Sequence, residues 1–267
     1  MSTQHSNMHS ATLDIEGAFR IPALEEEIYL ELPPGMKPGK ALLLNKSMYG
    51  LKQAACNWHT ELCTLLDNHK FTRSKIDGCL YFKRIDDKLV LIGIYVDDIR
   101  LLADNEKDLK KTDELISSEF PVQYKDQSKY LGIQITNYKG CITLDQTEAI
   151  DELLLEYNLA DAHPARTPAA PGTKLVKPSN NSDITTFPYN ELLGSLLWIA
   201  SVTRPDIYYA VGQCLKFATE YDNTHIVALK RILRYLKGSK DMCLKFNKGE
   251  SIINIITYMM LILLGNQ

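Results

Sequence analysis

The sequence lacks the cysteine pairs that hold zinc or form a disulfide framework. Its six cysteines are scattered, and no Cys-x-x-Cys pair occurs. A zinc site is therefore not expected, and the pattern fits a reducing compartment. The chain also has little excess charge, since 30 basic and 33 acidic residues give a formal net charge of -3. Composition alone thus predicts no nucleic-acid partner, and any such contact has to come from a local basic cluster.

Export and membrane insertion are not predicted either. Residues 1–12 are polar and have neither the basic start nor the apolar stretch of a secretory signal. The apolar run at residues 252–264 is shorter than the roughly 20 residues that a membrane-spanning helix needs. We therefore expect an intracellular protein, cytoplasmic or nuclear, that is not secreted and has no membrane partner.

The composition is otherwise that of a globular protein. The 267 residues are 45% hydrophobic and 24% charged, enough for one large domain or two modest ones. Periodicity predicts strands at residues 13–15, 27–32, 79–82, 89–96, 130–136 and 141–144, and helices at 54–68, 106–120, 146–157, 189–201, 205–219 and 224–237. Five prolines between residues 163 and 188 mark a linker. The expected fold class is α+β, with a helical C-terminal third.

Two adjacent carboxylates, Asp97 and Asp98, follow a strand that is almost entirely apolar. Burying such a pair is costly unless a metal or a cation compensates the charge. Asp-Asp pairs also cap many solvated turns, which is the plain structural alternative. A third carboxylate, Asp14, lies on another short apolar strand. Three carboxylates on neighbouring strands can hold two divalent ions about 4 Å apart for phosphoryl or nucleotidyl transfer. We predict that the three carboxylates converge at one edge of an antiparallel sheet.

A series of motifs over residues 13–246 resembles the reverse transcriptases of copia-type LTR retrotransposons. Residues 14–19 resemble the strand that carries the family's first catalytic aspartate, and Tyr95-Val96-Asp97-Asp98 resembles its Tyr-Val-Asp-Asp box. Further similar segments, in the family order, are residues 24–36, 46–58, 130–133, 203–207 and 225–238.

The resemblance implies a polymerase palm in which Asp14, Asp97 and Asp98 hold two Mg²⁺ ions. Its partners would be an RNA or DNA template-primer and deoxynucleoside triphosphates. The positions that match nucleotide-contacting residues of the family are Phe19, Tyr49, Gly50, Lys52 and Gln53. Those that match the primer-gripping segment are Tyr130, Leu131 and Gly132. A core-filling Phe19 and an ordinary turn at Gly50 are the structural alternatives.

The helix expected at residues 224–237 has an apolar face and a basic face. The basic residues are Lys230, Arg231, Arg234 and Lys237. Most basic helix faces are only solvated. The resemblance places this segment between polymerase and ribonuclease H, so weak, salt-sensitive contact with nucleic-acid backbone phosphates is predicted.

The resemblance also predicts how the chain is organised. The expected parts are a disordered N-terminus (1–12), a palm with partial fingers (13–125), a thumb-like segment (126–163), a linker (164–188), a mostly helical connection region (189–246) and an aberrant tail (247–267). Family members carry a fingers region before the first aspartate and a ribonuclease H domain after the connection. Neither has a counterpart in this sequence, so we expect a polymerase fragment that is inactive alone, because phosphate-positioning groups are missing.

Several departures from the family pattern favour a second hypothesis. Residues 20–23 replace an Asn-Gly turn, Ala55-Cys56 replaces Pro-Arg, and Arg100 lies in a strand expected to be apolar. A non-catalytic decayed or domesticated fragment that binds nucleic acid or a protein partner would tolerate such changes. A metal-dependent nuclease or phosphatase has no supporting His or Lys motif. Residues 259–265 fit a frameshifted start of ribonuclease H, so the tail is predicted to be poorly packed.

Overall fold

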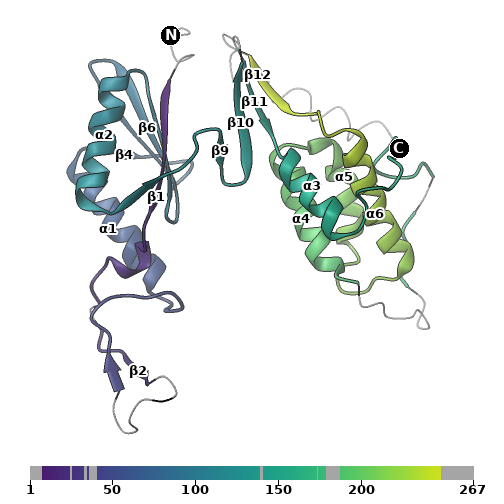
Figure 1. The fold of residues 1–267 in the computed structure, drawn as a ribbon, viewed down its shortest axis with the longest axis horizontal. Coiled ribbons are helices and arrows are strands. Elements are labelled where there is room, and N and C mark those ends of the chain that lie inside the picture. The colour runs from purple at the N-terminus through teal and green to yellow at the C-terminus, as the bar shows by residue number, and fades with distance from the viewer. Residues whose placement is uncertain are drawn as a thin grey trace. The chain divides into compact units, whose positions relative to one another are not determined.

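The computed structural model describes residues 8–24, 26–32, 35, 41–138, 141–172, 174–178 and 187–247. The chain divides into two compact units, residues 1–127 and residues 128–267 (Figure 1). Each unit has its own sheet and its own hydrophobic core.

The first unit is built on a six-stranded antiparallel sheet in the order β4-β5-β6-β7-β1-β8. Its strands are β1 (His9–Ile15), β4 (Thr72–Arg73), β5 (Leu80–Ile85), β6 (Lys88–Tyr95), β7 (Asp98–Ala103) and β8 (Val122–Tyr124). The apolar β6 lies inside the sheet, as its composition predicts.

Two helices, α1 (Ala54–Asn68) and α2 (Glu106–Glu119), cover one face of this sheet (Figure 1). Side chains alternate along a strand, so Leu13 and Ile15 of β1 point into the core while Asp14 points to the other face. On β7 the same alternation buries Ile99 and turns Asp98 outward. The face opposite the helices therefore carries Asp14 of β1 and Asp98 of β7.

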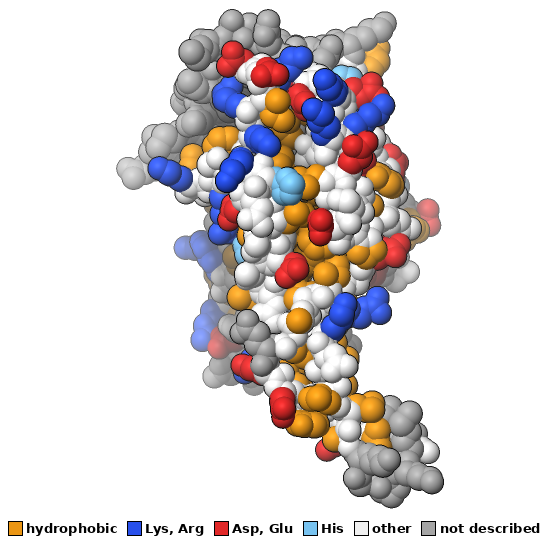
Figure 2. Space-filling model, turned by 90° about the vertical axis from the view of Figure 1, so that its left-hand side faces the viewer, with side chains coloured by type: hydrophobic (Ala, Val, Ile, Leu, Met, Phe, Trp, Pro, Cys, Tyr) orange, Lys and Arg blue, Asp and Glu red, His pale blue; other side chains and the backbone are white. Residues whose placement is uncertain are grey.

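A short hairpin extends from the first unit. It consists of β2 (Tyr29–Glu31) and β3 (Ala41–Leu43) and follows the 3-10 helix η1 (Ala18–Arg20). Its Tyr29, Leu42 and Leu43 are exposed. Figure 2 shows apolar side chains at the surface of this end of the molecule. On the rest of that face basic and acidic side chains are interspersed, so it has no uniform charge.

The second unit joins a four-stranded antiparallel sheet to a helical core. The sheet has the order β12-β11-β10-β9, formed by β9 (Lys129–Tyr130), β10 (Ile133–Tyr138), β11 (Cys141–Asp145) and β12 (Leu244–Asn247). The helices are α3 (Thr147–Glu156), α4 (Tyr189–Val202), η2 (Pro205–Ile207), α5 (Tyr208–Leu215) and α6 (Asn223–Gly238). Asp222 begins α6 with a capping box that includes the buried His225.

The α+β class is confirmed by antiparallel sheets and six α-helices in the described residues. Several boundaries differ from expectation. β1 begins at His9, so residues 9–12 are paired with β7 rather than disordered. A turn at Leu131 and Gly132 divides the strand expected at 130–136, and the helix expected at 205–219 begins as η2 at Pro205 and ends as α5 at Leu215.

Some predictions fall where nothing is described. Residues 1–7 of the expected disordered segment and residues 248–267 of the tail lie outside the described residues. Within the described ranges, no helix has the length and apolarity needed to cross a membrane.

Candidate metal centre

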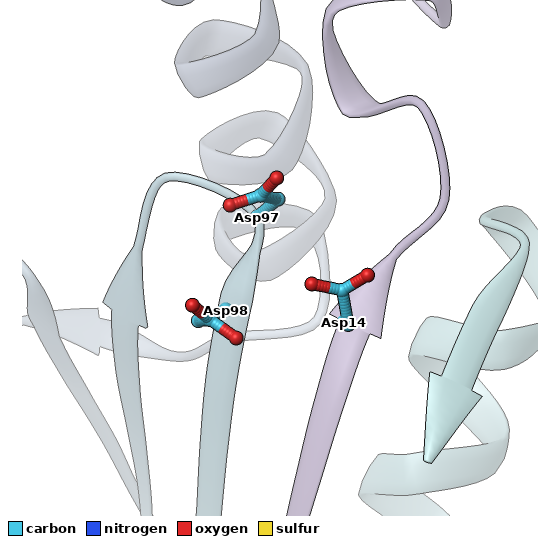
Figure 3. Close-up of side chains that lie close together, drawn as sticks. All are labelled: Asp14, Asp97 and Asp98. Carbon is cyan, nitrogen blue, oxygen red and sulfur yellow. The ribbon is translucent and has the colours of Figure 1, made fainter. Parts of the chain in front are cut away.

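Asp14 and Asp98 face each other across the neighbouring strands β1 and β7. They are Cα partners in the antiparallel register of β1 and β7. Both side chains point away from the helices and are only partly exposed (Figure 3). Directly opposed like charges in a sheet are unfavourable, so this pairing calls for a compensating cation.

Asp97 reaches the same place from a tight turn. Tyr95 pairs with Asp98, which leaves Val96 and Asp97 as a two-residue hairpin turn. Val96 has φ of 56°, a conformation that a β-branched residue rarely adopts. The Trp58 indole N–H donates to the Val96 carbonyl oxygen at 2.6 Å, and the Ile15 amide donates to the Asp97 carbonyl oxygen at 2.9 Å. Helix α1 and strand β1 thus hold the turn in its strained form.

The three predicted carboxylates come together in space. One carboxylate oxygen from each of Asp14, Asp97 and Asp98 lies within 4.8 Å of the others. They meet at the end of β1 and the start of β7, in the interior of the sheet rather than on an edge strand (Figure 3). Clustered carboxylate oxygens are the ligands that Mg²⁺ and Mn²⁺ prefer. The geometry fits a divalent ion, while the assigned roles stay predictions.

Lys125 is a site residue that sequence reasoning missed. Its Nζ atom lies 2.6 Å from Asp14 Oδ1 and 2.7 Å from Asp98 Oδ1. Hydrogen bonds to these two carboxylates raise the pKa of Lys125 above its ordinary value. Its partners are 111 and 27 residues away in sequence, so no local spacing signals the contact.

The positions predicted to contact a nucleotide are partly brought together. The rings of Phe19 and Tyr49 lie 4.5 Å apart, and Phe19 also packs against the core, so both interpretations of this ring fit. Gly50 has φ of 98°, which favours glycine. The Gln53 amide donates to Glu26 Oε2 at 3.3 Å. Contact of these residues with a nucleotide stays a prediction.

The predicted primer-gripping residues form a tight hairpin turn. Tyr130 pairs with Ile133, and both residues between them have positive φ, 50° at Leu131 and 72° at Gly132. This is the conformation of a type I′ turn. A Cβ atom on Gly132 would lie only 2.9 Å from Trp198 Cη2 of α4. The hairpin therefore rests on the helical part of its own unit.

Gly132→Ala is expected to destabilise the second unit by about 1–2 kcal/mol, because alanine is strained at positive φ and also collides with Trp198. Thermal and urea unfolding of the full chain measure this. Gly194→Ala is the matched control, since a Cβ there meets nothing within 4 Å and the residue lies within α4. Equal stability of Gly132→Ala and the wild type would contradict the expectation.

The four basic residues of α6 have partners inside the chain. Arg231 donates to Thr167 Oγ1, Arg234 donates to the His163 carbonyl oxygen, and Lys237 donates to the carbonyl oxygens of Ala160 and Ala162. Lys230 lies over the Phe187 ring. Three of them, Lys230, Arg231 and Arg234, also line a cavity of about 1190 Å³ between the linker and α5 and α6. This cavity belongs to the second unit, whereas the carboxylates belong to the first. Phosphate contact by the basic residues stays a prediction.

Sequence comparison assigns the chain to a protein family. Residues 2–171 match the family described as Reverse transcriptase (RNA-dependent DNA polymerase). The chain belongs to this family. It is 32% identical over 255 residues to the "Retrovirus-related Pol polyprotein from transposon TNT 1-94" of Nicotiana tabacum, covering 90% of this chain and 19% of that protein.

Two further relatives point to the same kind of element. The chain is 34% identical over 245 residues to the "Retrovirus-related Pol polyprotein from transposon RE1" of Arabidopsis thaliana, covering 90% of this chain and 17% of that protein. It is 30% identical over 248 residues to a "Putative transposon Ty5-1 protein" of Saccharomyces cerevisiae, covering 90% of this chain and 80% of that protein. The resemblance to retrotransposon reverse transcriptases is thereby confirmed. The chain spans less than a fifth of the length of the two polyproteins.

Proposed function

We propose that residues 13–125 form the palm of an RNA-directed DNA polymerase, with Asp14, Asp97 and Asp98 as its divalent-metal centre. The observation that carries this proposal is the opposition of Asp14 and Asp98 across β1 and β7, with Asp97 added by the adjacent turn. Two Mg²⁺ ions bound there would lower the pKa of a primer 3′-hydroxyl and neutralise nucleotide phosphates.

The chain's own residues would orient the reactants. The register of β1 and β7 fixes two of the carboxylates, and the Trp58–Val96 hydrogen bond fixes the turn that carries the third. Phe19 and Tyr49 would contact the sugar and base of a deoxynucleoside triphosphate, and Gly50 would let the backbone approach it closely. The substrate partners are a template-primer of RNA or DNA and these nucleotides.

The second unit would handle the primer and connect to later domains. We infer a thumb-like segment at residues 126–163, whose Leu131–Gly132 turn contacts the primer end, followed by a linker at 164–188 and a helical connection region at 189–246. The proposal is supported by the type I′ hairpin and by the helical core around α4, α5 and α6.

Asp97→Asn is expected to weaken Mn²⁺ binding at least about tenfold, since even the loss of a metal ligand's supporting partner has effects of this size. Isothermal titration of the full chain with Mn²⁺ measures the affinity. Asp87→Asn is the matched control, because Asp87 lies exposed in the β5–β6 turn at φ of 62°, where asparagine fits. Unchanged Mn²⁺ affinity in Asp97→Asn would contradict the metal centre.

The plain structural alternative, a pair of aspartates that caps a solvated turn, makes the opposite prediction. If the carboxylates only cap a solvated turn, neither Asp14→Asn nor Asp97→Asn changes Mn²⁺ binding. The inactivity expected from the sequence also stays a prediction. Primer extension with Mg²⁺ or Mn²⁺ measures it, and incorporation that depends on Asp97 would contradict it.

A further inference from the structure

Lys125 places an ammonium group between two of the three carboxylates. The residue follows β8, where its backbone amide donates to the Thr12 carbonyl oxygen at 3.0 Å. From this position the side chain crosses β1 and contacts Asp14 Oδ1 and Asp98 Oδ1 at 2.6 and 2.7 Å. A single positive charge therefore bridges the two strands at the place where their like charges oppose each other.

The bridge is able to open. The Lys125 side chain is 43% exposed, whereas those of Asp14 and Asp98 are each 23% exposed. Lysine is a flexible, strongly hydrated point charge that can leave a carboxylate for water at small cost. Asp14 and Asp98 are less able to move apart, because the strand register fixes their backbone positions.

A divalent ion and the Lys125 ammonium group compete for the same oxygens. Mg²⁺ binds carboxylate oxygen at about 2.1 Å. An ion at that distance from the oxygens that Lys125 contacts lies within about 5 Å of Nζ, where a double and a single positive charge repel strongly at partly buried sites. Binding of the divalent ion therefore opposes the contact of Lys125 with the carboxylates, and this contact opposes binding of the ion.

We propose that Lys125 is an internal counterion that a divalent metal has to displace from Asp14 and Asp98. In the metal-free protein it holds the opposed carboxylates together, and it lowers their affinity for the metal. Lys125 is a positioning residue in this account, and the account rests on the proposed metal centre.

The test compares Lys125→Gln with two variants. Lys125→Arg keeps the positive charge. Lys110→Gln removes a lysine that pairs with Glu106 at 2.7 Å on α2, away from the carboxylates, and serves as the matched control. Mn²⁺ titration of the full chains by calorimetry gives the affinities, and thermal unfolding in EDTA and in excess Mn²⁺ gives the stabilities. Lys125→Met is a second neutral variant if the glutamine variant does not fold.

Lys125→Gln is expected to bind Mn²⁺ about three to ten times more tightly than the wild type, the size of effect that a partly exposed ion pair has. In EDTA it should also unfold at a lower temperature than the wild type, and Mn²⁺ should raise its unfolding temperature by more. Lys125→Arg and Lys110→Gln should match the wild type.

The outcomes separate the two proposals. Equal or weaker Mn²⁺ binding by Lys125→Gln, while the wild type does bind, overturns the counterion and leaves the metal centre intact. If only the neutral Lys125 variants bind Mn²⁺, the counterion is supported. If neither wild type nor variant binds, the metal centre itself fails, and the counterion fails with it.

Discussion

Replacing Arg204 with alanine is expected to lower the free energy of unfolding of the second unit by about 3 kcal/mol or more, the usual result of removing one partner of a buried ion pair. Arg204 is only 1% exposed. Its guanidinium donates to both carboxylate oxygens of Asp206, at 2.9 and 2.7 Å. It also donates to the carbonyl and hydroxyl oxygens of Ser239, at 2.9 and 2.7 Å. One side chain thus joins the start of η2 to the end of α6.

Lysine should not replace this arginine well, because it cannot form the bidentate contact with Asp206. Chemical unfolding of Arg204→Ala, Arg204→Lys and the exposed Arg166→Ala tests the expectation. A loss below about 1 kcal/mol in Arg204→Ala, the range of an exposed ion pair, would contradict it.

The same ion pair gives the stability a pH dependence. Burial alone would raise the pKa of Asp206, but hydrogen bonds from Arg204 and Tyr235 outweigh it and lower the pKa. The contribution of this ion pair to the free energy of unfolding is therefore complete above the ordinary pKa of aspartate. It is lost as the pH falls through the lowered pKa of Asp206. The difference in stability between wild type and Arg204→Ala should shrink over that acidic range.

Trp58→Ala is expected to destabilise the first unit by about 3–5 kcal/mol, as for other buried aromatic residues. Trp58 is 1% exposed, and its ring lies 5.0 Å from that of Phe120 in an edge-to-face contact. It also donates the hydrogen bond that holds the Val96 carbonyl group. The substitution should therefore damage the proposed metal centre as well as the core.

Trp58→Phe separates these two effects. It keeps most of the ring but loses the N–H group, so it should cost about 1 kcal/mol for the hydrogen bond and weaken Mn²⁺ binding. The control is Leu66→Ala, a fully buried change in the same helix, which should reduce stability and leave the Mn²⁺ affinity of the folded protein unchanged. Wild-type Mn²⁺ affinity in Trp58→Phe would show that the turn keeps its shape without this hydrogen bond.

The parts of the fold that depend on local patterns were predictable. The apolar spacing in residues 54–68 predicts α1 with its observed bounds, and the charged pair Asp86-Asp87 predicts the turn between β5 and β6. Two aspartates after an apolar strand and one within another strand marked the candidate carboxylates, and the family resemblance was needed to assign the three to one site.

Long-range contacts were not predictable in this way. In the sequence Lys125 looks like an ordinary surface residue between Tyr124 and Asp126, and Arg100 looks out of place in an apolar strand. In the structure Arg100 donates to Thr12 Oγ1 and to the Gln127 carbonyl oxygen, so it ties together segments that are distant in sequence. The short strands β3, β4, β8 and β12 were missed because their pairing partners, rather than their own residues, define them.

The register of β1 and β7 makes the length of these strands as important as their composition. One residue inserted between Thr12 and Leu13 would turn the Asp14 carboxylate toward the helices and bring Leu13 to the polar face. An insertion in the β5–β6 turn would leave the pairing of Asp14 with Asp98 unchanged. As copies of such a retrotransposon accumulate mutations, those that keep the proposed metal centre should vary only by substitution within β1, whereas their β5–β6 turn can also differ in length.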